Sequence, residues 1–235
     1  MHDAEADRGS GGGSGGARRG RGGRAGLDAA RILEVARTLP PEELTMQAVA
    51  DRLGVDRKAL NYHVSGREGL LELVAANAFE TRFVPFAFAA DASWEDCCRR
   101  FATAVKDSLV DTGALIEYVR FDGPLGTLTL GPADALVERL VAAGFGIADA
   151  GRALDVLSLL AMGFARDVVT ARRHGRHPQG PYMEEALARP EAAGFHSLRR
   201  LVAEGVEIGD EETFRFGLEA TVSGLASLLA ASAAR

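Results

Sequence analysis

Residues 45–64 read TMQAVADRLGVDRKALNYHV, and this stretch decides how the whole chain is interpreted. Its first half places apolar residues at the i, i+3, i+4, i+7 spacing of one helix face: Met46, Val49, Ala50 and Leu53. Thr45 is a suitable N-cap for this helix, and Gly54 follows its end. Asp56 is placed to cap a second helix that runs to about residue 64. A short helix, a tight glycine turn and a second helix predict a helix-turn-helix.

The second helix carries polar groups on one side and apolar groups on the other. The helix-turn-helix should pack against the preceding helix at 29–36 through Val49, Leu53, Val55, Leu60 and Val64. The remaining residues form the exposed side of the second helix: Arg57, Lys58, Ala59, Asn61, Tyr62 and His63. A recognition helix presents such groups to the major groove, where Arg can pair with guanine, Asn with adenine, and Ala with a thymine methyl. Arg67, at the start of the next helix, is placed to hold a phosphate.

The charge distribution fits a DNA-binding segment attached to an acidic body. The net charge of the chain is -6, but residues 17–83 carry eleven Lys and Arg against nine Asp and Glu. Residues 84–235 carry fifteen basic and twenty-one acidic residues, which would keep that part away from a polyanion. Residues 1–26 include a Gly/Ser-rich stretch with four arginines, which should be a disordered arm. It is either a solvated tail or a basic arm that follows the phosphates or the minor groove.

The rest of the chain predicts an all-α protein with two folded domains, at residues 27–83 and 84–235. Helices are expected at 29–36, 46–53, 57–64, 66–83, 93–111, 114–121, 132–143, 148–174, 190–204 and 211–232. Ser65 and Glu68 fit a capping box that opens the helix at 66–83. The sequence FDGPLGTLTLG at residues 121–131 is typical of a loop, with Pro132 opening the next helix. HGRHPQGP at 174–181 predicts a break between helices.

The stretch GVDRKALNYHVSGREGLLELV resembles the DNA-binding domain of the tetracycline-repressor (TetR) family of transcriptional regulators. The resemblance covers about residues 27–83 and continues more weakly into the C-terminal half, through LVERLVAAGFGIADAGRALDVLSLLAMGF and FRFGLEATVSGLASLL. One departure is Asn61, which stands where the family commonly has a tyrosine, so a phosphate-contacting hydroxyl is missing there. Either Tyr62, next to it, compensates for the missing hydroxyl, or the backbone register differs slightly from that of the family.

The resemblance implies a role for each matching residue. Gln47 would reach a base or the DNA backbone, and Arg57, Lys58 and Ala59 would occupy the base-reading turn. Tyr62 and His63 would contact phosphates, and Arg67 would be the basic phosphate anchor. The resemblance also implies a homodimeric repressor of a palindromic operator. The helices near 148–174 and 211–232 agree independently, because both are too apolar for a monomer surface.

The family couples a small-molecule pocket in the C-terminal domain to the helix at 66–83. Expected pocket residues are Phe83, Phe86, Phe101, Val105, Tyr118, Leu136, Leu157 and Met162, although such residues more often belong to a plain core. The tetracycline-binding repressors use His side chains, one of them at the position of Phe83, and no His lies between His63 and His174. The sequence therefore argues against a tetracycline–Mg²⁺ chelate and favours an unidentified, more apolar organic effector, with no resident cofactor.

Other function classes find little support in the sequence. No motif for an α/β-hydrolase, P-loop, Rossmann or zinc-protease site is present, so no enzyme is predicted. Cys97 and Cys98 are adjacent and make a poor disulfide, and His174 and His177 lie in a loop without acidic neighbours in sequence, so no metal site is predicted. No signal peptide or membrane span is evident, which favours a reducing cytoplasm. The alternative function is a helical ligand- or partner-binding dimer that no longer binds DNA specifically.

Overall fold

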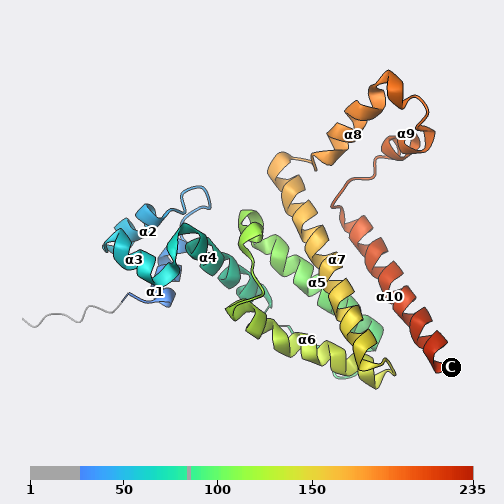
Figure 1. Ribbon diagram of the computed structural model, residues 1–235, viewed down its shortest axis with the longest axis horizontal. Helices are drawn as coiled ribbons and strands as arrows, with labels where there is room; N and C mark the ends of the chain where they lie inside the picture. The colour runs from blue at the N-terminus through green and yellow to red at the C-terminus, as the bar shows by residue number, and fades with distance from the viewer. Residues whose placement is uncertain (1–26, 84–85, 235) are drawn as a thin grey trace, which may run out of the picture.

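The computed structural model describes residues 27–83 and 86–234, and throughout these ranges the regular structure is helical (Figure 1). The prediction of an all-α fold is therefore confirmed. The helices in chain order are α1 (Ala29–Ala36), α2 (Met46–Leu53), α3 (Arg57–Val64), α4 (Gly66–Phe83), α5 (Trp94–Asp111), the 3-10 helix η1 (Gly113–Tyr118), α6 (Pro124–Ala142), α7 (Ile147–His174), α8 (Gln179–Ala188), the 3-10 helix η2 (Pro190–Ala192), α9 (His196–Ala203) and α10 (Glu211–Ala233). The predicted arm at 1–26 lies outside the described residues.

The first hydrophobic cluster joins α1, α2, α3 and the first half of α4. Ile32, Val49 and Leu60 are fully buried in it, one from each of the first three helices. Leu70 and Leu71 of α4 complete the cluster. Burial of such side chains stabilises the folded chain by roughly 1.5–3 kcal/mol each, so three short helices that would be unstable alone are held together.

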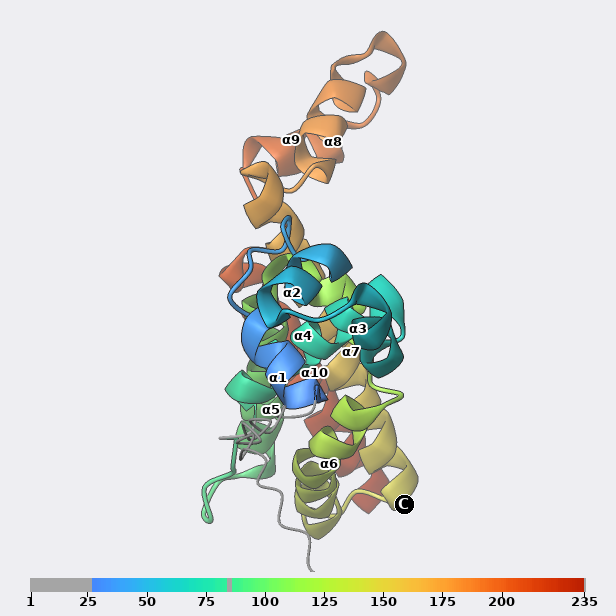
Figure 2. The same cartoon turned by 90° about the vertical axis from the view of Figure 1, so that its left-hand side faces the viewer.

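The second cluster lies between α5, α6 and α7, with α10 along the side of α7 (Figures 1 and 2). Its fully buried residues include Leu136 and Leu157. Helix α4 belongs to both clusters, since its second half contributes Phe79 and Phe83 here. A single helix of 18 residues therefore connects the two halves of the chain rigidly.

Helix α10 is held to α5 by two ion pairs as well as by apolar contacts. Arg99 of α5 donates two hydrogen bonds to the Glu219 carboxylate, at 2.7 and 2.9 Å. Nearer the start of α10, the Lys106 ammonium lies 2.6 Å from Glu211 Oε2 and 4.7 Å from the centre of the Phe214 ring. These contacts fix which face of α10 turns away from the protein.

The predicted loop at 121–131 is wrong, because α6 begins at Pro124 and continues through this stretch. Pro124 occupies the first turn, where a missing N–H is not needed. Pro132 then lies inside the helix rather than at its start, at the cost of one backbone hydrogen bond. Burial of Leu125, Leu136 and Leu140 in the second cluster outweighs the low helix propensity of the Gly- and Pro-rich sequence.

The segment between α7 and α10 also differs from the prediction. Residues 179–188, which begin inside the predicted break, form α8. The single helix expected at 190–204 is instead η2 followed by α9, because Pro190 opens only a 3-10 turn and the chain bends before Phe195. Helices α8 and α9 pack on each other and α8 packs on η2, but neither packs on another described helix, and they project from the body (Figures 1 and 2).

Candidate DNA-binding face and regulatory contacts

The turn between α2 and α3 has the geometry that the sequence predicted. The Thr45 side chain accepts a hydrogen bond from the Ala48 N–H, and Gly54 ends α2 in the left-handed region, at φ 66°. The Val55 N–H returns to the Ala50 carbonyl, which closes the turn tightly. Asp56 then caps α3 by accepting a hydrogen bond from the Lys58 N–H at 2.6 Å. The two helices are therefore set at a fixed angle by local contacts alone.

All six polar-side residues of α3 are exposed: Arg57, Lys58, Ala59, Asn61, Tyr62 and His63. On the opposite side, Leu60 and Val64 are buried in the first cluster, as predicted. Tyr62 is 87 % exposed, and its ring touches the edge of the His63 ring, with the centroids 5.5 Å apart. A large aromatic ring that is almost fully exposed to solvent is available to an external partner.

Gln47 and Arg67 flank this face from α2 and α4. Both side chains are exposed. The Gln47 amide donates a hydrogen bond to Asp51 one turn along α2, at 2.7 Å. Together with the exposed side of α3, these residues form one polar surface, which we call the α3 face (Gln47, Arg57, Lys58, Ala59, Asn61, Tyr62, His63 and Arg67).

The predicted capping box at Ser65 is wrong. A capping-box serine has extended backbone, but Ser65 has φ 53° and ψ 40° and ends α3 in the left-handed conformation. Gly66 follows with φ 93°, so α4 begins immediately. Gly69 lies so close to the end of α3 that a Cβ there would be 1.8 Å from the Val64 carbonyl oxygen. This turn is tighter than a capping box allows, and it places the start of α4 directly after the end of α3.

Seven of the eight expected ligand-pocket residues lie in or against the second cluster, whereas Tyr118 packs against the first. Phe83, Phe101, Val105, Leu136 and Leu157 are buried in the second cluster. The other three are half-buried: Phe86, Tyr118 and Met162. Phe86 lines an open hollow beside α5, and Tyr118 lines a crevice of about 750 Å³ between α4, the end of α3 and the start of α6. Their role as effector contacts stays a prediction.

The 3-10 helix η1 connects the two hydrophobic clusters, which the sequence did not reveal. Leu115 is 7 % exposed and packs in the first cluster, whereas its neighbour Ile116 packs in the second. Just after η1, Arg120 lies 3.4 Å from Glu72 and 3.8 Å from Glu68, both on α4. A movement of η1 would therefore be transmitted to α4, and α4 begins at the end of α3.

Helices α7 and α10 each leave large apolar side chains exposed. On α7 these residues are Ile147, Val156 and Leu159, and on α10 they are Phe216 and Leu228. Phe216 is 75 % exposed and Ile147 is 70 % exposed. The two helices lie side by side over part of their length, with the rings of Phe164 and Phe214 in edge contact. Exposed apolar side chains of this size on two adjacent helices are unusual for a monomer surface.

Comparison with known proteins agrees with this geometry. Residues 89–229 match the family model of the tetracyclin repressor-like C-terminal domain, which is more than half of the chain. The chain belongs to the TetR family. TetR-family proteins are DNA-binding transcriptional regulators with a ligand-binding C-terminal domain. The family membership that the sequence predicted is therefore confirmed. No protein of curated function matches the sequence.

Solved structures of the TetR family share the fold over most of the chain. A possible TetR family transcriptional regulator from Streptomyces coelicolor A3(2) is 25% identical, with 86% of this chain and 100% of that chain covered and a TM-score of 0.68. The Streptomyces coelicolor TetR family protein ActR in complex with actinorhodin is 20% identical, with 86% and 97% covered and a TM-score of 0.61. A TetR variant from Acinetobacter baumannii AYE in complex with minocycline is 20% identical, with 86% and 98% covered and a TM-score of 0.59.

The cysteines of this TetR-family chain are not activated thiols. Cys97 and Cys98 are both buried and free. Burial, with smaller contributions from Cys97 and Glu95, raises the pKa of the Cys98 thiol to about 12. Because the thiolate is the nucleophile, a thiol with this pKa is unreactive near neutral pH. His177 does have an acidic neighbour, since its Nε2 lies 3.6 Å from Asp167, but no group of three metal-ligating side chains occurs among the described residues.

Helix α10 of the TetR-family domain is long and apolar enough to cross a membrane, judged by length and composition alone. In the most apolar 18-residue stretch of α10, 11 % of the residues are buried within the protomer. Glu219, in the middle of this helix, is ion-paired with Arg99, which ties α10 to the helical body. The exposed apolar surface is therefore a face of a packed helix.

Proposed function

We propose that the protein is a homodimeric transcriptional repressor that binds a palindromic operator through the α3 face and is released by a small organic effector. The observation that carries the proposal is the exposed polar side of α3, fixed by the Gly54 turn and backed by the buried Leu60 and Val64. Tyr62 is 87 % exposed and the residues around it on α3 are exposed as well, which is an arrangement that a duplex would complete.

Within the α3 face we assign the first turn of α3, together with Asn61, to base reading. Arg57 can pair with guanine, Asn61 with adenine, and Ala59 can contact a thymine methyl. Lys58 lies beside them, and Gln47 approaches from α2. Tyr62, His63 and Arg67 are assigned to phosphates, which fix the protein's register on the duplex without reading sequence. Because α4 starts at Gly66, the Arg67 side chain lies at a helix N-terminus, where backbone amides also favour a phosphate.

A two-fold dimer through α7 and α10 would bring two α3 faces to one side of the assembly. Support comes from the exposed apolar side chains of both helices and from the four-helix interface that such a pair can form. A two-fold axis would place the two recognition helices about 34–36 Å apart, one turn of the duplex. The acidic residues 84–235 would then face away from the DNA.

We propose that the effector binds inside the C-terminal domain and acts through η1. The proposed contacts are those expected from the sequence: Phe83, Phe86, Phe101, Val105, Tyr118, Leu136, Leu157 and Met162. These side chains are apolar and closely packed, so an organic molecule would enter by moving helices apart. Such a movement reaches Leu115 and Arg120, which contact the first cluster and α4. An effector that prefers the separated arrangement would shift the population away from the DNA-binding one.

The remaining parts of the proposal concern chemistry and location. No catalytic role and no resident cofactor are assigned, and the lack of a His at Phe83 argues against a tetracycline–Mg²⁺ chelate. We place the division between the DNA-binding domain and the regulatory domain at residue 83. The protein would act in the cytoplasm, where its buried thiols stay reduced.

Selection of bound duplexes from a random-sequence library tests the proposal. We expect wild-type protein to enrich a palindrome whose half-sites are about one helical turn apart, with two protomers bound per site. Tyr62→Ala should weaken binding to that site, whereas Tyr182→Ala, which removes an exposed tyrosine from α8, should not. If no sequence is enriched and binding is indifferent to both substitutions, the protein is instead a helical ligand- or partner-binding dimer.

A further inference from the structure

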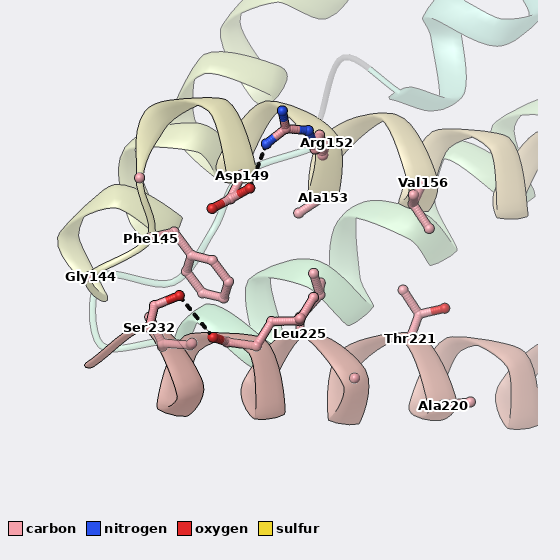
Figure 3. Close-up of a pocket in the computed structure, with 14 residues that line it drawn as sticks. Gly144, Phe145, Asp149, Arg152, Ala153, Val156, Ala220, Thr221, Leu225 and Ser232 are labelled. Atoms are coloured by element: carbon pink, nitrogen blue, oxygen red, sulfur yellow. Dashed lines mark hydrogen bonds and ion pairs between the residues drawn. The ribbon is translucent and has the colours of Figure 1, made fainter. Parts of the chain in front are cut away.

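A hollow of about 480 Å³ opens between α7 and α10 (Figure 3). The helices pack closely where Gly217 meets Leu160, since a Cβ at Gly217 would be 3.3 Å from that leucine. Towards the end of α10 they separate. Phe145 and Leu225 point into the space from opposite sides, and Val156 borders it from α7. The hollow is therefore lined mainly by apolar side chains and is open to the outside.

Two glycines on these helices, one of them at the hollow, have open space beside them among the described residues. Gly224 on α10 lines the hollow, and Gly163 lies on the exposed face of α7. A Cβ at either position would meet nothing within 4 Å, and both residues have ordinary helical backbone. A glycine inside a helix is roughly 1 kcal/mol less favourable than alanine. Gly217, in contrast, is explained by its close contact with Leu160. Open space at Gly224 and Gly163 is what a second helix surface would need.

The proposed function sets the direction in which a second copy must approach. Both DNA-binding units have to lie on the same side of the dimer, so the two-fold axis runs along the direction from α3 to the C-terminal domain. In Figure 1 this direction is horizontal, and α7 and α10 run steeply across it. A two-fold axis that runs at a steep angle to a helix makes the two symmetry-related copies of that helix roughly antiparallel. The start of one α10 therefore meets the end of the other.

Phe216 is the side chain that this symmetry brings to the hollow. It is the largest exposed apolar residue of α10 and lies near its start, whereas the hollow extends to Leu228 and beyond. At 1.5 Å per residue, Phe216 and Leu228 each lie about 9 Å from the point midway between them on α10. Where two antiparallel copies of α10 cross at this midpoint, Phe216 of one copy lies opposite Leu228 of the other. We propose that the hollow between α7 and α10 receives the Phe216 side chain of a second copy of this chain.

This proposal rests on the two-fold dimer proposed above and assigns its central contact. Each protomer provides one Phe216 and one hollow, so the contact forms twice, as an isologous interface requires. Buried aromatic residues in well-fitted pockets are typical hot spots of protein interfaces. The occupant is a phenyl ring, because the lining offers no unpaired charge. At the rim, Asp149 is already held by Arg152 at 2.6 Å, as Figure 3 shows.

Sedimentation equilibrium of substituted proteins tests the contact. Phe216→Ala removes the ring, and Gly224→Leu fills the hollow from within. We expect each to raise the dimer dissociation constant by on the order of 100-fold or more, because a large apolar contact is lost twice. The two together should cost little more than either alone, since they remove the same contact. Leu130→Ala is the matched control, because Leu130 is 63 % exposed on α6 and lies outside the hollow.

Folding of the variants is checked independently. Phe216 is exposed, and leucine at 224 meets open space and favours the helix, so neither variant should unfold at a lower temperature as a dilute monomer. A dimeric wild type with unchanged dissociation constants in both variants would overturn the Phe216 contact alone. A monomeric wild type would overturn the proposed dimer as well.

Cross-linking tests the antiparallel direction. With a short bis-maleimide, Phe216→Cys combined with Leu228→Cys should give covalent dimers, and Phe216→Cys alone should not. Cys97 and Cys98 are buried and should not react. Efficient cross-linking of the single variant would show parallel α10 helices and would overturn the assignment.

Discussion

Leu115→Ala is expected to loosen α1, α2 and α3 while leaving α7 intact, although residue 115 follows α5 in sequence. Leu115 is 7 % exposed and packs in the first cluster, so truncation removes nearly all of a buried contact. Buried Leu→Ala changes cost about 2–5 kcal/mol, and the position of Leu115 at the cluster edge favours the lower end of this range. A loss of about 2 kcal/mol corresponds to a roughly 30-fold larger population of opened states.

Hydrogen exchange measured peptide by peptide is the assay for this prediction. Amides of the first three helices should exchange about 30-fold faster in Leu115→Ala, and amides of α7 should be unchanged. Leu109→Ala is the matched control, because Leu109 is 2 % exposed and packs only in the second cluster. It should accelerate exchange in α7 first. Equal acceleration of both regions by Leu115→Ala, or none in α1–α3, would refute the assignment of η1 as the connection.

Three further predictions concern stability and reactivity. Hydrogen bonds from Arg99 hold the pKa of the Glu219 carboxyl below its usual value, so this pair stabilises the fold above that value and the contribution is lost as pH falls through the lowered pKa. The melting temperature of Glu219→Gln should therefore lie below that of wild type at pH 7. The difference should shrink as pH falls below the usual glutamate pKa of about 4.3 and should vanish only below the lowered pKa. Glu212→Gln, at an 84 % exposed side chain, should behave as wild type throughout. The buried Cys98 thiol, with its pKa raised to about 12, should resist maleimide labelling at pH 8 until the protein is unfolded, and labelling at the rate of a free thiol would contradict this. Gly69→Ala should lower the melting temperature by several degrees because its Cβ would collide with the Val64 carbonyl, whereas Gly131→Ala, where a Cβ meets nothing within 4 Å, should not.

The helix-turn-helix could be predicted from sequence because its determinants are local. Thr45 and Asp56 cap helices that begin within one residue of them, and Gly54 supplies the left-handed turn. The exposed and buried sides of α3 also follow from helical periodicity once Leu60 and Val64 are assigned to the core. These features depend on spacing within 20 residues, so no knowledge of distant contacts is required.

Features that depend on distant contacts were missed. Glycines and prolines at 123–132 favoured a loop, but burial of Leu125, Leu136 and Leu140 makes this stretch helical. The same limit applies to Ser65, whose left-handed backbone is set by the packing of α4 against α3. Leu115 has no sequence signal that assigns it to the first cluster. The hollow between α7 and α10 likewise arises from the angle at which two helices far apart in sequence meet.

The central claim is that each of two protomers holds the DNA through its α3 face and the start of α4. The salt dependence of operator binding tests this claim most directly. On the selected palindrome, we expect the logarithm of the association constant to fall linearly with the logarithm of the salt concentration. Arg67→Ala should reduce this slope by about 2, since each protomer would lose one phosphate contact worth about 0.9. Arg173→Ala, at an exposed arginine near the end of α7, should leave the slope unchanged. Equal slopes for wild type and Arg67→Ala would contradict the proposed binding mode.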